Sequence, residues 1–351
     1  MKIGVSLPCL DHSAEELAGF VAAAEHAGLD AVWNYEVFKN PFVLHALAAH
    51  MTERIELCIG LAANAIRSPY EMANAAIDVA GISHGRLVLG VGPGTAGLMD
   101  IYSGVGVDRP VARTREYLTV LKLAFEHLAA GTPASYEGAY QRFGTPTTMW
   151  GARADGRVSI PIYLGAVRPK MLQLAGEMCD GIVGYLLRPS YIEQVIRPNL
   201  VAGAARVGRD PDALQIVSFT ICSANEDREV AMRRARIQVG VYLTHPLNQM
   251  MAQEAGLDRE LGEVLSTVEK HGPAALEHVT DDQLVSMFSL TGTPEECRRQ
   301  AEQYDGPLTH ICLHTPYIPP FTPEETKDAF MGIVKAFARE PEPATPVVPA
   351  R

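Results

Sequence analysis

The sequence predicts a (β/α)8 barrel, an α/β fold in which eight parallel strands alternate with helices. Short apolar segments of strand length alternate with amphipathic segments of helix length almost from end to end, and such alternation favours a parallel sheet covered by helices. The length of 351 residues suits one barrel that carries insertions. Eight strand candidates, the number that closes such a barrel, lie at 2–7, 30–34, 55–61, 86–91, 160–164, 180–184, 214–222 and 308–313.

The helical segments between these strands carry recognisable start signals. Ser13 and Glu16 have the spacing of a capping box. The apolar stripe that follows them consists of Leu17, Phe20, Val21 and Ala24. Ser68 stands before Pro69, which is the order of a cap residue and a proline in the first helical position. Residues 323–338 are expected to form the closing helix.

Two segments are longer than a minimal barrel unit requires. Residues 131–159 predict a loop containing Gly, Thr and Arg between the fourth helix and the fifth strand, and residues 240–292 predict extra helices before the last strand. Long insertions of this kind usually serve as lids or partner surfaces. The sequence therefore predicts one barrel domain over 1–338 with an insertion at about 240–292, followed by a Pro-rich, disordered tail over 339–351.

Composition and charge exclude several classes of function. The formal net charge is −11, and non-specific binding to nucleic acid needs a clustered basic surface instead. The six cysteines are scattered and form no C-x-x-C pair, so neither a disulfide framework nor a zinc site is predicted. The chain enters a strand at once with "MKIGVSLP", and no apolar run approaches the length of a membrane span. A cytoplasmic protein without membrane contact is expected.

A glycine-rich turn follows the fourth strand. The stretch "RLVLGVGPGTAGLMD" over 86–100 places Gly92, Gly94 and Gly97 in G-x-G-x-x-G spacing. A dinucleotide-binding fold needs such a turn to open a helix directly after the first strand. Here the next convincing helix starts only near residue 110. The turn is therefore interpreted as one at the C-terminal end of a barrel strand, where glycine lets the backbone approach a ligand closely.

Several segments in order resemble the luciferase-like monooxygenase superfamily and, within it, the branch that uses the deazaflavin coenzyme F420, as methylenetetrahydromethanopterin reductases do. "GLDAVWNYEVF" is similar to the second strand of that family, and "TERIELCIGLAANAIRSPYEMANAAIDVAGISHGRLVLGVGPG" to its third and fourth units. "RPVARTREYLTVLK" resembles the next helix, "IPIYLGAVRPKMLQLAGEMCDGIVGYLLRPSYIEQVIRPNL" the fifth and sixth units, and "GTPEECRRQAEQY" the approach to the eighth strand. The resemblance spans about residues 1–338.

The resemblance implies a barrel whose flavin or deazaflavin lies across the C-terminal mouth. It also implies a bulge with a non-prolyl cis peptide at the end of the third strand, where Ala62, Ala63 and Asn64 stand behind the central ring. An ordinary strand end before a capped helix is the alternative interpretation. Gly92 and Gly94 would bring the backbone close to the ring or the ribityl chain, or would form a plain turn at the barrel rim.

The segment "GAVRPKMLQLAGEMCDG" combines a strand end with a helix that starts near Pro169. Free backbone amides and the helix dipole favour an anion at such a position. In the family, this position resembles the site that holds the phosphodiester of the cofactor. The residues concerned are Gly165, Ala166, Val167, Arg168 and Lys170. The deazaflavin branch commonly has glycine where Arg168 stands, and a solvated helix cap is the alternative interpretation.

Two residues are candidates for proton transfer. Many deazaflavin-dependent members of the family have an Asp-His or Glu-His pair where this chain has Glu36 and Val37, so the acid is kept and the histidine is absent. Glu36 could donate a proton, or could be a surface or salt-bridged carboxylate. On the eighth strand, "THICLHTP" places His314 nearest the C-terminal end, where it could replace the missing histidine.

The same strand places His310, Cys312 and His314 on one face. Without a fourth ligand nearby, packing is favoured over metal binding, and no metal site is predicted. Aromatic side chains at strand ends, among them Tyr185, Tyr35 and Trp33, could stack on a cofactor ring.

The predicted function is that of an oxidoreductase that transfers a hydride between coenzyme F420 and a small organic substrate, with the 240–292 insertion excluding water. The alternative on the same fold is a monooxygenase that depends on reduced FMN. A flavin-binding barrel without catalysis is another alternative, and so is an unrelated phosphate-binding isomerase. That isomerase would need a glycine-rich phosphate turn after strands seven and eight, where this chain has "CSANED" and "HTPYIPP". The family habit implies a homodimer.

Overall fold

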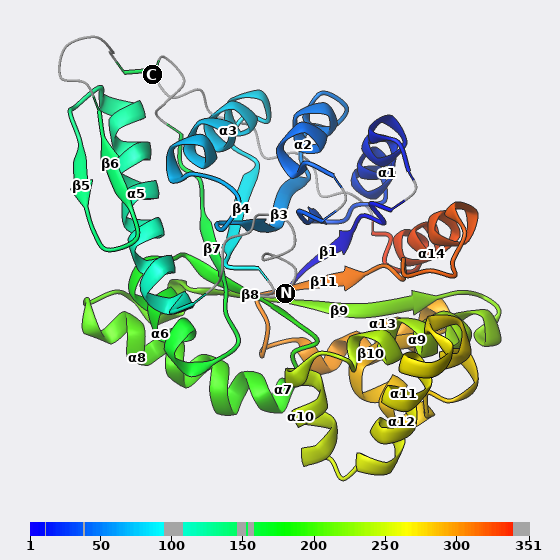
Figure 1. Cartoon of the computed structure of the whole chain (residues 1–351). Helices are drawn as coiled ribbons and strands as arrows, with labels where there is room; N and C mark the ends of the chain where they lie inside the picture. The colour runs from blue at the N-terminus through cyan, green and yellow to red at the C-terminus, as the bar shows by residue number, and fades with distance from the viewer. Residues whose placement is uncertain (11, 38, 95–107, 146–151, 154–157, 340–351) are drawn as a thin grey trace.

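The computed structural model describes residues 1–339 apart from 11, 38, 95–107, 146–151 and 154–157. Eight parallel strands close into a barrel, with each strand paired to the next barrel strand along the chain and the last paired to the first (Figure 1). They are β1 (Lys2–Ser6), β2 (Ala31–Asn34), β3 (Glu56–Ala63), β4 (Leu87–Gly92), β7 (Ile162–Gly165), β8 (Gly181–Tyr185), β9 (Gln215–Ala224) and β11 (His310–His314). The predicted (β/α)8 barrel and its eight strand segments are confirmed.

Helices surround the barrel, and Figure 1 shows them on its outer side. They are α1 (Ala14–His26), α2 (Pro41–Ala49), α3 (Pro69–Ile82), α5 (Pro110–Ala130), α6 (Pro169–Met178), α7 (Pro189–Tyr191), α8 (Arg197–Arg206), α9 (Arg228–Tyr242) and α14 (Pro323–Ala336). Ser13 and Glu16 form the predicted capping box of α1. Ser68 accepts a hydrogen bond from the backbone N–H of Glu71 and caps α3.

The first insertion differs from the loop that the sequence predicts. It contains a short antiparallel hairpin of β5 (Ser135–Glu137) and β6 (Arg142–Gly144). Glu116 of α5 stabilises the hairpin turn, because its carboxylate accepts hydrogen bonds from the backbone N–H groups of Ala139, Tyr140 and Gln141. The part of the first insertion at 146–151 and 154–157 lies outside the described residues.

The second insertion contains the predicted helices, namely α10 (Pro246–Glu254), α11 (Asp258–His271) and α12 (Asp282–Phe288). A strand that the sequence did not predict follows them, because β10 (Ser289–Gly292) pairs in parallel with the end of β9 at Ile221–Ala224. Helix α13 (Pro294–Ala301) then leads to β11. No helix among the described residues combines the length and the apolar character that a bilayer span needs. The predicted tail lies outside the described residues from 340 onward.

Aromatic side chains fill the interior of the barrel. Trp33 of β2 is fully buried and meets Phe219 of β9 edge to face, with 5.4 Å between ring centroids. The indole N–H of Trp33 donates to Nε2 of His310, at 3.2 Å. Trp33 is therefore part of the barrel core, and the expectation that it could stack on a cofactor ring is wrong.

Candidate active site

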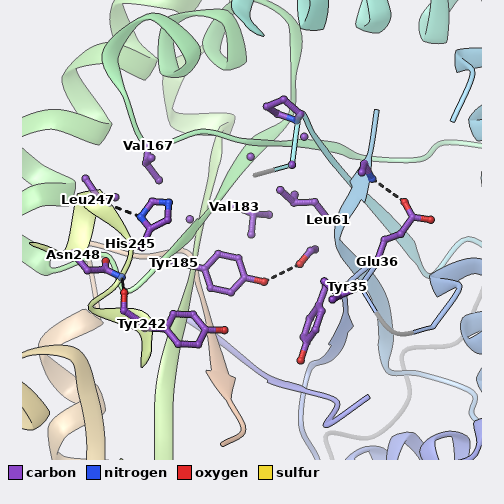
Figure 2. Close-up of a pocket in the computed structure, with 18 of the residues that line it drawn as sticks. Tyr35, Glu36, Leu61, Val167, Val183, Tyr185, Tyr242, His245, Leu247 and Asn248 are labelled. Atoms are coloured by element: carbon purple, nitrogen blue, oxygen red, sulfur yellow. Dashed lines mark hydrogen bonds between the residues drawn. The ribbon is translucent and has the colours of Figure 1, made fainter. Parts of the chain in front are cut away.

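A cavity of about 520 Å³ opens at the C-terminal ends of the strands (Figure 2). Its volume lies within the usual range of small-molecule sites, and its location is where barrel enzymes build their active sites. Residues from seven segments line it, and these segments lie within 35–37, 60–63, 92–94, 165–167, 183–185, 241–248 and 317–318, with residues 62, 243 and 246 outside the lining.

The cavity brings together most of the residues that the sequence singles out. Those that line it are Glu36, Ala63, Gly92, Gly94, Gly165, Ala166, Val167 and Tyr185. Five predicted site residues do not line it, namely Ala62, Asn64, Arg168, Lys170 and His314. Ala62 is buried, and the backbone N–H of Asn64 donates to the carbonyl of Gly92, at 2.9 Å. Both residues therefore support the wall from behind.

A bulge at the end of β3 shapes the wall beside Leu61. The register of β3 against β4 shifts between Ile59 and Ala62, and the peptide bond between Gly60 and Leu61 is cis. A bulge is present, as the resemblance implies, but its cis bond precedes the predicted Ala62–Asn64 segment.

Two of the predicted glycines make room for Leu61. A Cβ atom added to Gly92 would lie 2.7 Å from Cδ1 of Leu61, and one added to Gly165 would lie closer still. The side chain of Leu61 therefore occupies the space that these glycines leave. Gly92 also lines the cavity, and the expectation that it brings the backbone close to a ligand stays a prediction. Gly94 has a φ of 72°, a conformation that favours glycine.

Glu36 lines the cavity as a largely buried carboxylate, with 10% of its side chain exposed. One oxygen accepts a hydrogen bond from the backbone N–H of Ala63, at 2.8 Å. The other accepts from Nε of Arg67, at 2.7 Å, and forms an ion pair with the same guanidinium. The salt-bridged interpretation of Glu36 therefore describes its contacts, and the carboxylate holds the bulge against α3.

The N-terminus of α6 meets one end of the cavity at Val167. The N-cap residue, Arg168, makes no side-chain cap hydrogen bond, and the first helical residue is Pro169, which has no N–H. Arg168 and Lys170 are exposed at this helix end. Backbone amides, the helix dipole and two cationic side chains thus lie beside the opening, an arrangement that favours an anion.

Tyr185 contacts the bulge directly. Its hydroxyl donates to the carbonyl of Gly60, at 3.1 Å (Figure 2). Its ring stacks on Phe219, with 4.6 Å between centroids, and lies nearly parallel to the ring of Tyr242 at 6.2 Å. Tyr185 therefore lies in an aromatic cluster, and its hydroxyl contacts the bulge at the cavity wall.

His314 lies one layer behind the cavity wall. It is fully buried, and burial lowers the pKa of its imidazole to about 3. Its Nδ1 lies 2.8 Å from the hydroxyl of Ser6, and its Nε2 lies 2.7 Å from the hydroxyl of Tyr242. His314 is therefore neutral near pH 7 and reaches the cavity only through Tyr242. Within the described part of the chain, no three His, Cys, Asp or Glu side chains gather as metal ligands would.

The sequence did not indicate the contribution of the α9–α10 junction. Tyr242, His245 and Asn248 line the cavity from this junction. The side-chain amide of Asn248 donates to the carbonyl of Tyr242, at 2.8 Å, and His245 caps α10 by accepting from the N–H of Leu247. Burial lowers the pKa of His245, and the nearby positive charge of Arg168 lowers it further. His245 before a proline marks a helix start, but no local pattern places that start at the cavity.

Comparison with known proteins agrees with this geometry. A family model described as luciferase-like monooxygenase matches residues 1–310. A protein named 5,10-methylenetetrahydromethanopterin reductase from Archaeoglobus fulgidus is 30% identical over 328 residues, covering 91% of this chain and 95% of the relative. The protein of that name from Methanolobus tindarius is 29% identical over 316 residues, covering 87% of this chain and 91% of the relative.

Solved structures share the fold. Coenzyme F420-dependent tetrahydromethanopterin reductase from Methanopyrus kandleri has a TM-score of 0.80 at 24% identity, covering 95% of this chain and 97% of that one. The oxygenating component of 3,6-diketocamphane monooxygenase from Pseudomonas putida, in complex with FMN, has a TM-score of 0.67 at 17% identity, covering 96% and 98%. Because the family model matches most of its length, this chain belongs to the luciferase-like monooxygenase family, a family of oxidoreductases.

Proposed function

We propose that this protein is a coenzyme F420-dependent oxidoreductase that transfers a hydride between the cofactor and a small organic substrate held in the cavity. One observation carries the proposal: a cavity of about 520 Å³ with apolar walls ends at the uncapped N-terminus of α6. A planar ring with an anionic tail matches such a space. The names of the relatives from Archaeoglobus fulgidus and Methanolobus tindarius support the same reaction class.

The residues present fit a deazaflavin in chemical type. Leu61 and Val183 offer an apolar surface to a ring. The N–H of Ala166 already donates to the carbonyl of Val183, at 3.3 Å, so the backbone amides of Val167 and Arg168, together with the side chains of Arg168 and Lys170, would hold the phosphate of the tail. The bound deazaflavin would supply hydride exchange at its C5 atom. The protein would orient the substrate, and the 241–248 segment of the insertion would exclude water from one side of the cavity.

Glu36 and His314 are the two candidates for proton transfer that the sequence singles out. The carboxylate of Glu36 already accepts hydrogen bonds from Ala63 and Arg67, which favours a role in holding the bulge. His314 contacts Tyr242 and not the cavity itself, which favours a role in positioning that tyrosine.

The family habit of pairing supports a homodimer as a further proposal. Large apolar side chains are exposed on and beside α2 and α3, and they are Val43, Met51, Ile66, Tyr70 and Ile82. An apolar surface of this kind is what a partner subunit would cover. We expect the second copy to pack on this face.

The test of the proposed function is a titration of the apo-protein with oxidised coenzyme F420 and, separately, with FMN, followed by quenching of cofactor fluorescence. We expect F420 to bind at least tenfold more tightly than FMN. Preference for FMN would favour the monooxygenase alternative, which the shared fold of the FMN-bound 3,6-diketocamphane monooxygenase supports. If neither cofactor binds, both the F420-dependent and the FMN-dependent functions are contradicted. Binding of F420 with no turnover of any organic substrate would favour a barrel that only stores or senses the cofactor.

A further inference from the structure

Tyr242 presents a phenol to the cavity from the C-terminal end of α9. Its ring lines the cavity, and Figure 2 shows its hydroxyl directed towards the cavity interior. That hydroxyl lies 2.7 Å from Nε2 of His314 and 3.4 Å from the hydroxyl of Tyr317. The backbone of Tyr242 is fixed as well, because its carbonyl accepts from the amide of Asn248, at 2.8 Å. The phenol is thus held at the wall by contacts on two sides.

The hydrogen-bond partners of Ser6 and His314 determine which of their atoms carry protons. The Ser6 hydroxyl is fully buried and, among the described residues, has two partners: it accepts from the N–H of Thr315, at 3.0 Å, and lies 2.8 Å from Nδ1 of His314. A buried hydroxyl needs an acceptor for its own proton. The imidazole Nδ1 is the acceptor available, so Ser6 donates to it. Because His314 is neutral, its one proton is then on Nε2.

This tautomer decides the direction of the next hydrogen bond. The Nε2–H of His314 donates to the phenol oxygen of Tyr242, so the phenol keeps its own proton for another acceptor. That acceptor is either the Tyr317 hydroxyl, at the long distance of 3.4 Å, or a group in the cavity. The opposite tautomer would commit the Tyr242 proton to His314 and leave nothing to donate.

We propose that Tyr242 is the residue that exchanges a proton with the substrate, and that His314 and Ser6 act behind it as positioning residues. The proposal rests on the proposed function. It extends the sequence-based candidates by assigning direct contact with the substrate to a residue of the insertion. It also explains why His314 lies near the site without lining the cavity.

Every proton in the transfer from Tyr242 to the substrate has a donor and an acceptor. In the reducing direction, a bound, reduced deazaflavin would supply the hydride that a carbon of the substrate takes up. The O–H bond of Tyr242 breaks as a new bond forms between its proton and the substrate heteroatom. The electron pair of the O–H bond stays on the phenol oxygen. The resulting phenolate accepts from the Nε2–H of His314. Solvent returns the proton after product release, by way of Tyr317, which is half-buried at the rim.

The surroundings of Tyr242 agree with a protonated donor. The titratable groups that face it include those of Tyr317, Tyr185, Tyr35, Cys312 and His314, all of which are neutral near pH 7. Burial raises the pKa of the Tyr242 phenol well above its usual range. The phenol therefore carries its proton before reaction.

The decisive test needs neither cofactor nor substrate. The tautomer of His314 is measured by NMR on protein labelled with ¹⁵N-histidine at pH 7, with His314→Gln to assign the signal. We expect the Nε2–H tautomer in the wild type and a mixture of tautomers in Ser6→Ala. The Nδ1–H tautomer in the wild type would overturn the proposal, because the Tyr242 proton would then be committed to His314.

A kinetic comparison adds a readout that a merely structural role would not move. Tyr242→Phe is compared with Tyr136→Phe, a control on the β5–β6 hairpin away from the cavity, in oxidation of reduced F420 by methylenetetrahydromethanopterin. We expect Tyr242→Phe to lower kcat by at least a hundredfold while its Kd for F420 stays within twofold. Full turnover by Tyr242→Phe would overturn the proposal. Failure of the wild type to bind F420 would contradict the proposed function instead. The tautomer measurement would still test the hydrogen-bond arrangement of Ser6, His314 and Tyr242.

Discussion

Glu36 connects three parts of the active-site wall at the scale of single residues. It follows β2 in the chain. Its carboxylate accepts a hydrogen bond from the backbone N–H of Ala63 at the end of β3, and it forms an ion pair with Arg67, which stands just before α3. Arg67 also pairs with Glu71, at 2.9 Å, and lies over the ring of Phe42, at 5.1 Å. With 10% of Glu36 and 14% of Arg67 exposed, the pair is shielded from solvent, so its loss leaves a poorly solvated charge.

We predict that Glu36→Gln lowers the free energy of unfolding by about 1–3 kcal/mol, because the guanidinium of Arg67 loses a buried charged partner. Urea denaturation measures the change. The matched control is Glu71→Gln, which removes the half-exposed partner of the same arginine and should cost less than about 1 kcal/mol. Equal costs for the two variants would contradict this account of Glu36.

The contacts of Glu36 also show what a sequence can settle at this scale. The acid after the second strand was singled out by the resemblance to the family, which has an acid at that position. Its partner was not, because Arg67 lies 31 residues further along the chain and no periodicity relates the two. Tyr242 was missed for a similar reason: it ends a helix in an insertion, and only the tertiary fold brings that end to the cavity.

At the scale of elements, the bulge of β3 and the glycines of β4 and β7 form one packing unit. The bulge directs Leu61 against Gly92 and Gly165, where a side chain would collide with it. Overpacking of a close contact of this kind typically costs about 1–3 kcal/mol. These glycines therefore serve the position of Leu61 on the cavity wall.

We predict that Gly165→Ala destabilises the protein by about 1–3 kcal/mol in urea denaturation, because the new Cβ displaces Leu61. Adding Leu61→Ala to it should remove part of that cost, so the double variant is more stable than the sum of the two single changes allows. Gly19→Ala is the control. No atom lies near its added Cβ, and it should stabilise α1 by about 1 kcal/mol. Strict additivity of Gly165→Ala and Leu61→Ala would contradict the packing unit.

The elements that the sequence predicted are those that belong to the regular alternation of strands and helices. The eight barrel strands appear as apolar runs separated by capped amphipathic helices, and the structure confirms them. The hairpin of β5 and β6 and the strand β10 have only 3 or 4 residues each. Length alone does not separate them from the barrel strands, because β2 and β7 also have 4 residues each. The hairpin depends on a contact with Glu116, and β10 depends on pairing with the end of β9, so neither is set by its own sequence.

At the scale of the whole molecule, the interior holds several histidines without charge. Burial lowers the pKa of His45 from 6.5 to about 4, and lowers those of His310 and His314 from 6.5 to about 3. Between these values the unfolded chain binds protons that the folded chain does not. The stability that these groups contribute is therefore complete above pH 6.5 and is lost as the pH falls towards 3.

We predict that the free energy of unfolding falls between pH 6.5 and pH 4 by about 1.4 kcal/mol per pH unit for each of these histidines. Urea denaturation at a series of pH values measures the slope. His314→Gln should reduce this slope by the contribution of one buried histidine. His278→Gln, at a side chain that is 78% exposed, should leave the slope unchanged. A wild-type slope in His314→Gln would contradict the neutral, buried imidazole.

We propose that the cavity holds a deazaflavin whose anionic tail meets α6. The most direct measurement is a crystal structure of the protein with oxidised coenzyme F420. We expect the ring against Leu61, on the side of the cavity that Tyr242 faces, and the phosphate at the backbone amides of Val167 and Arg168. A ring outside the cavity, or a phosphate bound away from the start of α6, would contradict it.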